Sequence, residues 1–265
     1  MTTFRIVTAV TAGTLTLGLL AGCDGVSLGQ RRLDFDRTEQ TRITKIVVSP
    51  GAGDVTVSTA TVDTVRIKRV VRYRGGQPGD TYQLDGTELR IDTDCGSMCN
   101  VSYEIVAPTG VSISGENGSG DFTLSNLADV DVKVGSGDIT LTGATGTVRA
   151  QTGSGDIELN RVESTSTLRT GSGSVHGDGL GGRVDATTGS GDITLLLVAP
   201  GSVNARASSG TIELTVPEGS YQLRMQSSSG RAESGVRTDP AAVHRLDLET
   251  GSGDIRISSR PVVPR

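Results

Sequence analysis

Residues Gly153–Asp156 read Gly-Ser-Gly-Asp, and this four-residue phrase recurs from residue 118 almost to the end of the chain. Complete copies stand at Gly118–Asp121, Gly135–Asp138, Gly153–Asp156, Gly189–Asp192 and Gly251–Asp254, and degenerate copies at Gly171–Ser174, Ser208–Thr211 and Ser228–Arg231. Successive copies lie 17 to 20 residues apart, and only the last interval is longer. A period in this range is typical of a stack of repeated structural units.

Short stretches of alternating apolar and polar residues flank each copy, as in strands that turn one face to a core. Two residues after the second glycine of the phrase stand Phe122, Ile139, Ile157, Val175, Ile193, Ile212, Ala232 and Ile255. The next, outward position is mostly polar, and a further apolar row, Leu127, Ala144, Val162, Leu180 and Val198, is expected to pack under the return turn. Three residues before the glycine the side chains are small, commonly Thr, which predicts a thin interior.

A unit of two short strands cannot bury its apolar face alone, so we expect units to stack with parallel strands about 4.8 Å apart. The sequence therefore predicts an all-β fold, a flattened parallel β-solenoid of about eight rungs over residues 109–258, and the usual crossover handedness favours a right-handed coil. The glycines suit a corner that needs positive φ and close backbone approach.

Residues 43–108 form a strand-rich lead-in that we interpret as first coils plus a hairpin capping the N-terminal end, because a bare stack exposes unpaired strand edges. Residues 259–265, with two prolines, are predicted to be a C-terminal tail. The composition, 34% hydrophobic and 3% aromatic without Trp, leaves little bulk for a thick core. A formal net charge of −5 argues against a nucleic-acid partner.

The N-terminus reads as an export signal over residues 1–22, with Arg5 before a 15-residue apolar stretch too short for a comfortable membrane span. The stretch ends in Leu20-Ala21-Gly22-Cys23, which resembles the lipobox of bacterial lipoproteins. That resemblance implies cleavage before Cys23 and transfer of a diacylglyceryl group to its thiol; the alternative is an uncleaved anchor helix. We expect residues 23–42 to be the lipidated Cys and a tether, and the protein to be held at the outer face of the bacterial cell membrane.

Cys95 and Cys99 are the remaining cysteines. An exported compartment is oxidising, so we expect a disulfide that closes this small loop and staples the cap. A metal site would lack further Cys or His ligands nearby, and a redox pair is more usually spaced by two residues.

The aspartates of the phrase, Asp121, Asp138, Asp156, Asp192 and Asp254, form a second candidate site. We interpret them as turn residues that accept backbone N–H bonds. The alternative is a calcium ladder as in repeat-in-toxin solenoids, but here the acid follows the glycine directly, and Ser174, Thr211 and Arg231 interrupt the row. We therefore expect no metal and no cofactor.

The sequence contains no phosphate loop, zinc helix or dinucleotide fingerprint. Gly25-Val26-Ser27-Leu28-Gly29 formally matches the nucleophile elbow of hydrolases, but it lies in the expected tether and not between a strand and a helix. His176 falls on an outward strand position and His244 in the last inter-rung segment, neither beside a candidate nucleophile. We predict that the protein is not an enzyme.

Residues 150–159 and 186–195 carry the repeat most plainly, and the chain resembles a bacterial family of proposed adhesins of unknown function, with Thr-Gly-Ser-Gly-Asp-(Val/Ile) repeats behind a strand-rich lead-in. The resemblance covers about residues 43–258 and implies an exported β-solenoid with no catalytic residues. We expect a monomeric binding or scaffolding surface for another envelope protein or a glycan. The alternatives are a polysaccharide-acting β-helix enzyme and a component of an envelope-stress sensor.

Overall fold

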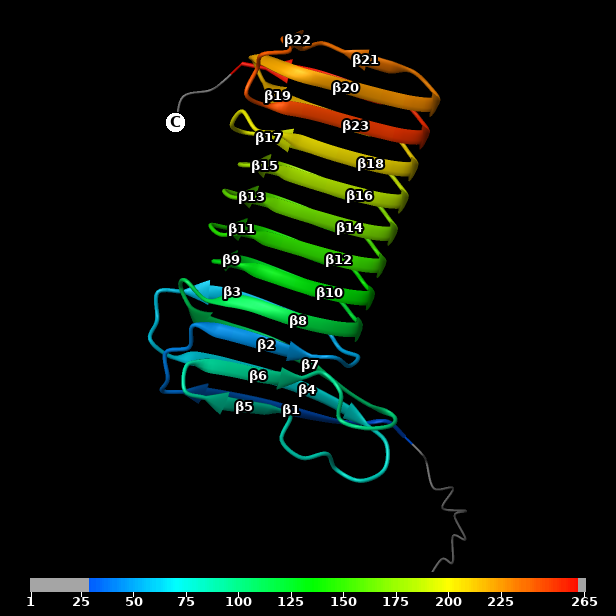
Figure 1. Ribbon diagram of the computed structural model, residues 1–265. Helices are drawn as coiled ribbons and strands as arrows, with labels where there is room; N and C mark the ends of the chain where they lie inside the picture. Colours follow the sequence, from blue (N-terminus) through cyan, green and yellow to red (C-terminus); the bar gives the residue numbers. More distant parts are fainter. Residues whose placement is uncertain (1–28, 262–265) are drawn as a thin grey trace, which may run out of the picture.

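The computed structural model describes residues 29–261, which form two facing β-sheets of twelve strands each (Figure 1). Sheet A contains, in spatial order, β1 (Arg31–Glu39), β4 (Val65–Tyr73), β7 (Cys99–Pro108), β3 (Val55–Ala60), β9 (Phe122–Leu127), β11 (Ile139–Ala144), β13 (Ile157–Val162), β15 (Val175–Leu180), β17 (Ile193–Leu197), β19 (Ile212–Pro217), β24 (Ile255–Arg260) and β21 (Ala232–Ser234). Sheet B contains β22 (Arg237–Thr238), β20 (Ser220–Ser229), β23 (Arg245–Ser252), β18 (Val203–Ser209), β16 (Val184–Ser190), β14 (Ser166–Ser172), β12 (Val148–Ser154), β10 (Val130–Ser136), β8 (Ser112–Ser119), β2 (Lys45–Ser49), β6 (Glu88–Asp92) and β5 (Tyr82–Asp85).

Each rung is one strand of sheet B joined through the repeated phrase to one strand of sheet A, which confirms the predicted solenoid. The rungs pair in parallel with the phrases in register, so that Ser136 lies beside Ser154 and Ile139 beside Ile157. The lead-in over residues 43–108 is rich in strands, as predicted, and two pairs of them, β2–β3 and β6–β7, add rungs of their own to the stack. Sequence reasoning had placed the eight repeats of residues 109–258 correctly.

The core consists of rows of like side chains contributed by the inward positions of both sheets. Ile139, Ile157 and Ile193 stack along sheet A, while Val130, Val148 and Val184 stack along sheet B, each almost fully buried. Burying an aliphatic side chain of this size contributes about 1.5–3 kcal/mol, so these rows bind each rung to its neighbours.

The last two rungs exchange places relative to the chain order. Strand β23 lies between β18 and β20, and β24 lies between β19 and β21, so residues 245–260 insert beneath residues 220–234. The physical reason is that the two rungs differ in how apolar their inward faces are. The inserted rung buries Leu246, Leu248 and Ile255, whereas the terminal rung carries exposed Ala232 and Ser234 and can face solvent.

A similar exchange occurs at the N-terminal end. The β2–β3 rung lies between β6–β7 and β8–β9, although it precedes both in sequence. Beyond it, β4 pairs antiparallel with β7 and β5 pairs antiparallel with β6. These antiparallel strands cover the edges of the stack, as the prediction of a hairpin cap required.

The prediction of a tether over residues 23–42 was wrong for its second half, because Arg31–Glu39 form strand β1, paired antiparallel with β4 over nine residues. The physical reason is an alternation that the charged composition obscures: Leu33 and Phe35 turn inward while Asp34 and Asp36 turn outward. The strand shields the edge of β4 and places charged groups on the new edge, which discourages edge-to-edge association.

Two smaller predictions also need correction. The C-terminal tail begins later than predicted, because β24 extends to Arg260, which pairs with Pro217. In the apolar row after the phrase, Val198 is 36% exposed and Leu197 takes the buried place beside Leu180. No helix among residues 29–261 is long and apolar enough to cross a membrane. The predicted signal peptide, Cys23 and the rest of the tether lie outside the described residues.

Candidate functional site

The corner between the two sheets depends on the second glycine of the phrase. Gly155 has φ of 146°, and a Cβ placed there would lie 2.1 Å from the carbonyl oxygen of Gly137 in the preceding rung. The first glycine is equally crowded, since a Cβ at Gly153 would lie 2.5 Å from the Gly135 carbonyl oxygen. Both the conformation and the spacing therefore demand glycine, as the sequence predicted.

The threonines before the phrase hold the same corner from inside. The Thr170 hydroxyl donates to the carbonyl oxygen of Gly155 at 2.9 Å, and Thr152 and Thr188 make the equivalent bond to the glycine of the rung before them. Sequence reasoning read this row only as small side chains and missed its hydrogen-bonding role. Burying a hydroxyl group without a hydrogen-bond partner costs about 1–3 kcal/mol of stability, so these hydrogen bonds offset the burial of the threonine side chains.

The repeated aspartates connect successive rungs. The Asp121 Oδ1 accepts the backbone N–H of Asp138, and Asp138 and Asp156 do the same for the next rung at 2.8 and 2.7 Å. Asp54 begins this series and Asp192 serves Thr211. The prediction that these carboxylates accept backbone N–H bonds is confirmed, but each bond runs to the neighbouring rung instead of closing its own turn.

At the far end, Asp254 accepts the backbone N–H of Arg231 at 3.0 Å. This bond, together with nearby Arg256, lowers the pKa of the Asp254 carboxyl below its ordinary value. The Arg231 side chain has no hydrogen-bond acceptor for the backbone N–H of a further rung. The series of bonds therefore ends where the stack ends. Within residues 29–261 no group of three or more His, Cys, Asp or Glu side chains is arranged to hold a metal ion.

Cys95 and Cys99 form the predicted disulfide, which closes the loop between β6 and β7. Their Cα atoms are 5.3 Å apart. The loop belongs to the N-terminal cap, where the sequence had placed it. His176 is exposed on the outer face of β15 beside Glu158 and Thr194, and His244 precedes β23. The structure brings neither histidine to a candidate nucleophile.

A buried polar cluster joins the two layers of the cap. Arg69 is only 4% exposed, lies over the Phe35 ring at 4.2 Å and donates to the Thr81 hydroxyl at 3.0 Å. The Tyr103 hydroxyl also donates to Thr81, and burial raises the pKa of Tyr103 to about 12. These hydrogen bonds join β4 and β7 to the segment before β5, and we interpret the cluster as structural.

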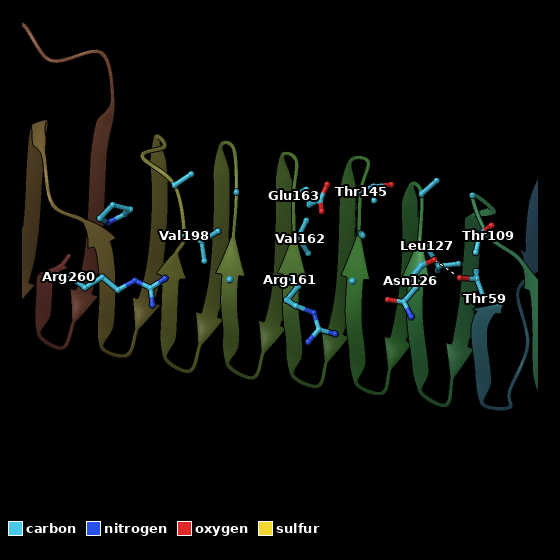
Figure 2. A pocket seen from close by; sticks show the side chains of 18 of the residues that line it. Thr59, Thr109, Asn126, Leu127, Thr145, Arg161, Val162, Glu163, Val198 and Arg260 are labelled. Atoms are coloured by element: carbon cyan, nitrogen blue, oxygen red, sulfur yellow. Dashed lines mark hydrogen bonds between the residues drawn. The ribbon is translucent and has the colours of Figure 1, made fainter. Parts of the chain in front are cut away.

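The main concave feature is a groove along the edge of the stack where sheet A strands turn back toward sheet B (Figure 2). Its volume is about 1190 Å³. It begins at Thr59 on β3 and ends at Pro261 after β24, so it crosses the ends of eight neighbouring strands. With strands about 4.8 Å apart, the groove is roughly 34 Å long.

A column of residues in the left-handed backbone conformation shapes this groove. Asn126, Gly143, Arg161 and Gly179 occupy the same place in successive rungs, with φ between 55° and 84°. Each falls where the regular pairing skips one residue, for example between Thr142–Asn160 and Ala144–Val162. Neighbouring strands skip this residue together, so the register is kept, and the left-handed residue turns the next side chain into the core. The ends of the sheet A strands are therefore hollowed at these four rungs.

The polar groups of the groove are few and widely spaced. Figure 2 shows Asn126, Arg161 and Arg260 on the strand side and Thr145 and Glu163 on the side of the return turns. Arg260 donates to the Leu197 carbonyl at 3.2 Å, whereas Arg161 and Glu163 make no ion pair with another described residue. Much of the remaining lining is Gly, Ala and Thr, which leaves backbone accessible.

Sequence reasoning missed this groove. The available signal was the column itself, because two glycines and an asparagine at equivalent positions are the residues that most readily adopt left-handed backbone. Arg161 at the third position gave no such indication. Among the residues that line the groove there is one carboxylate, Glu163, and neither histidine nor cysteine.

Comparison with known proteins agrees with this architecture. A crystal structure of a protein from Bacteroides fragilis, described as a proposed adhesin, has 14% sequence identity and a TM-score of 0.53, and the match covers 85% of this chain and 97% of that one. At this identity the likeness shows the fold alone. A protein from Clostridium sporogenes, described as a proposed cell adhesion protein, has 12% identity and a TM-score of 0.34, covering 88% of this chain and all of that one.

No curated protein matches the chain. The sequence pattern of one family matches residues 43–258, which include the whole repeat region and the lead-in strands β2 to β7. The chain belongs to the Toastrack DUF4097 family.

Proposed function

We propose that this protein is a non-catalytic, lipid-anchored surface protein of the bacterial envelope whose solenoid binds an anionic linear polysaccharide along the groove. Membership of the Toastrack family and the fold shared with a proposed adhesin support an adhesin-like role. Cys23, at the end of the lipobox-like stretch, is the proposed site of acylation. A tether from Asp24 to Gln30 would then hold the cap close to the membrane.

The observation that carries the proposal is the shape of the groove. It runs along the axis of the stack across eight strands, so its long dimension matches an extended chain and not a compact molecule. Part of its lining repeats from rung to rung, because the left-handed residue recurs at the same place in the four rungs from Asn126 to Gly179. A polymer with a short chemical repeat could make equivalent contacts at several rungs.

Charge and polarity favour an acidic carbohydrate as the ligand. The groove carries two guanidinium groups, Arg161 and Arg260, against the single carboxylate of Glu163, although the chain as a whole has a net charge of −5. Guanidinium groups bind carboxylates through paired hydrogen bonds. The Thr145 hydroxyl and the Asn126 side-chain amide would be available to sugar hydroxyls, whereas the Thr59 hydroxyl donates to the Asn126 carbonyl oxygen at 2.7 Å.

The same lining supports binding without catalysis. Hydrolysis of a glycosidic bond ordinarily requires two carboxyl groups on opposite sides of the bond. The described lining offers Glu163 alone, with no second acid facing it. The lining therefore favours holding a polysaccharide over hydrolysing it with a pair of carboxyl groups.

Titration of the protein with a labelled polyuronate, monitored by fluorescence anisotropy, tests the binding. Replacement of Arg161 by Ala should weaken binding about tenfold, because a charge-assisted hydrogen bond contributes about 1.4 kcal/mol or more. The matched control is Arg149→Ala, on the outer face of sheet B, which should leave the affinity unchanged. Equal affinity in both variants, or equal binding of neutral dextran, would overturn the groove as the site.

The anchor is tested separately in cells. The wild-type protein should sediment with membranes and incorporate labelled fatty acid, whereas Cys23→Ser should incorporate none. Labelled fatty acid on the Cys23→Ser protein would show that the anchor lies elsewhere.

A further inference from the structure

A basic corner stands at the base of the N-terminal cap, where the described chain begins. It comprises Arg31, Arg32, Arg72 and Arg74 together with Met98, and we refer to these five residues as the basal corner. Arg31 and Arg32 begin β1, Arg72 lies near the end of β4, Arg74 follows β4 directly, and Met98 lies in the loop before β7. Figure 1 shows β1, in blue where the described chain begins, at this end of the cap.

Strand register places the five residues together. Arg31 pairs with Tyr73, which in turn pairs with Cys99, and Arg32 pairs with Arg72. The pairing continues one step beyond the strands, because the backbone N–H of Arg74 donates to the Met98 carbonyl at 3.1 Å. The arginines and Met98 therefore occupy neighbouring places at one end of three adjacent strands.

The arginines of the corner outnumber the carboxylates beside them. Arg32 pairs with Asp34 at 2.7 Å, but Arg31, Arg72 and Arg74 make no ion pair in the part of the chain that the structure describes. Asp80 pairs with buried Arg69, whereas Asp94 accepts the backbone N–H of Gly96 and keeps its charge. The pKa of Asp34 is lowered by its hydrogen bond with Arg32 and further by the charge of Arg72. Four arginines therefore stand against the two carboxylates of Asp34 and Asp94 at this corner. This accumulation contrasts with the net charge of −5 of the whole chain.

Met98 adds an apolar contact at the same place. Its side chain is 68% exposed, and its backbone adopts a positive φ of 59°. The disulfide between Cys95 and Cys99 closes the loop that presents it. A large apolar side chain held outward beside unpaired arginines is the combination that an interfacial membrane contact requires.

The position along the chain identifies the partner. Cys23, the proposed acylation site, precedes Arg31 by eight residues, a span of at most about 28 Å when fully extended. A single acyl chain gives marginal binding, and a basic patch close to the anchor supplies a second attachment. Arginine binds phosphate groups through paired hydrogen bonds, which suits phospholipid headgroups.

We propose that the basal corner docks on an anionic phospholipid surface, with Met98 inserted at the interface, and so stands the solenoid upright on the membrane. This rests on the proposed acylation of Cys23 for its proximity to the bilayer. Docking would hold the cap against the membrane and direct the long axis of the groove away from it. The binding of phosphate groups by the arginines and the insertion of Met98 are properties of these residues themselves.

The test uses the purified lipidated protein inserted into vesicles of phosphatidylcholine alone or mixed with phosphatidylglycerol. Hydrogen peroxide oxidises exposed methionine, and the rate at Met98 is followed by mass spectrometry, with half-buried Met225 at the opposite end as the internal reference. We expect oxidation of Met98 to be at least about fivefold slower on the anionic vesicles, since each arginine near such a surface contributes about a fivefold preference. Met225 should oxidise equally on both.

The variant with Arg31, Arg72 and Arg74 changed to Glu should lose this protection and still float with both kinds of vesicle. The matched control, with Arg183, Arg206 and Arg245 changed to Glu on the outer face of sheet B, should keep it. Equal oxidation of Met98 on both vesicles by a protein that floats with them would overturn the docking. Failure to float with phosphatidylcholine vesicles would instead overturn the anchor. Protection that survives the triple change would show that Met98 is covered by something other than the lipid, such as a second protein.

Discussion

The carboxylate of Asp138 accepts the backbone N–H of Asp156 at 2.8 Å, one rung further along the stack. The repeated aspartate is therefore a connection between rungs, made by one of its oxygens, while the carboxyl group as a whole is exposed to water. Exposed carboxylates about 4.8 Å apart repel one another by only about 1 kcal/mol, so the row needs no cation to neutralise it.

This arrangement predicts that calcium does not stabilise the protein. Calorimetric melting in EDTA and in millimolar calcium should give the same Tm. A cation bound to the native state at 100 times its Kd would add about 2.7 kcal/mol, or roughly 5–10 °C for a domain of this size. A rise of that extent, abolished by changing Asp138 and Asp156 to Asn, would restore the calcium ladder.

The corner glycines predict a large and position-specific loss of stability. Gly155→Ala should lower the free energy of unfolding by about 3 kcal/mol or more, because its φ is 146° and the new Cβ would overlap the Gly137 carbonyl oxygen. Gly79→Ala, with no atom within 4 Å of the added Cβ, should change stability by less than about 0.5 kcal/mol. Urea melts of both variants provide the comparison, and a similar loss in each would contradict the explanation.

The row of threonines before the phrase predicts that one substitution lowers the free energy of unfolding and that another raises it. Thr170→Val should cost about 1–2 kcal/mol, since the Gly155 carbonyl loses its donor. Ala207 occupies the equivalent buried position in another rung, where no hydroxyl is present. Ala207→Thr should therefore stabilise the protein by about 0.5–1.5 kcal/mol through a bond to the Gly191 carbonyl. Denaturant midpoints decide the matter, and a destabilised Ala207→Thr would show that the corner cannot accept the larger side chain.

Tyr103 predicts a loss of stability at alkaline pH. Burial raises its pKa to about 12, above the ordinary value of about 10, so the folded protein keeps the phenol proton longer than the unfolded chain. The resulting stability is complete below pH 10 and falls by about 2–3 kcal/mol as the pH rises to 12. Urea melts between pH 9 and 12 should show a shallower decline for Tyr103→Phe than for the wild type. Parallel declines would contradict the assignment.

The repeat made most of the fold predictable from sequence. Rows such as Ile139, Ile157 and Ile193 fixed both the strand faces and the rung register, because period-two alternation and a recurrent phrase are local signals. The order of rungs at the two ends was not a local property. The order follows from which rung has the more apolar inward face. Ile255 is buried in the inner rung, whereas Ala232 at the equivalent place is exposed in the terminal rung, and this difference matters only once the rungs are stacked.

The groove was less accessible to sequence reasoning than the stack. Its column of left-handed residues includes Asn126 and Gly143, whose types suggest left-handed backbone, but the hollow itself arises from how these residues align in consecutive rungs. Strand β1 was missed for a different reason, because its charges outnumber Leu33 and Phe35. In both places the tertiary arrangement decided the outcome.

The central claim, that the groove is the ligand-binding surface, is tested most directly by hydrogen–deuterium exchange with and without a saturating polyuronate. Binding should slow exchange in the return turns that border the groove, at residues 126–129, 143–147 and 161–165. Exchange on the outer face of sheet B, around Arg206, should remain unchanged. Slowed exchange on that outer face, with the return turns unaffected, would contradict the account.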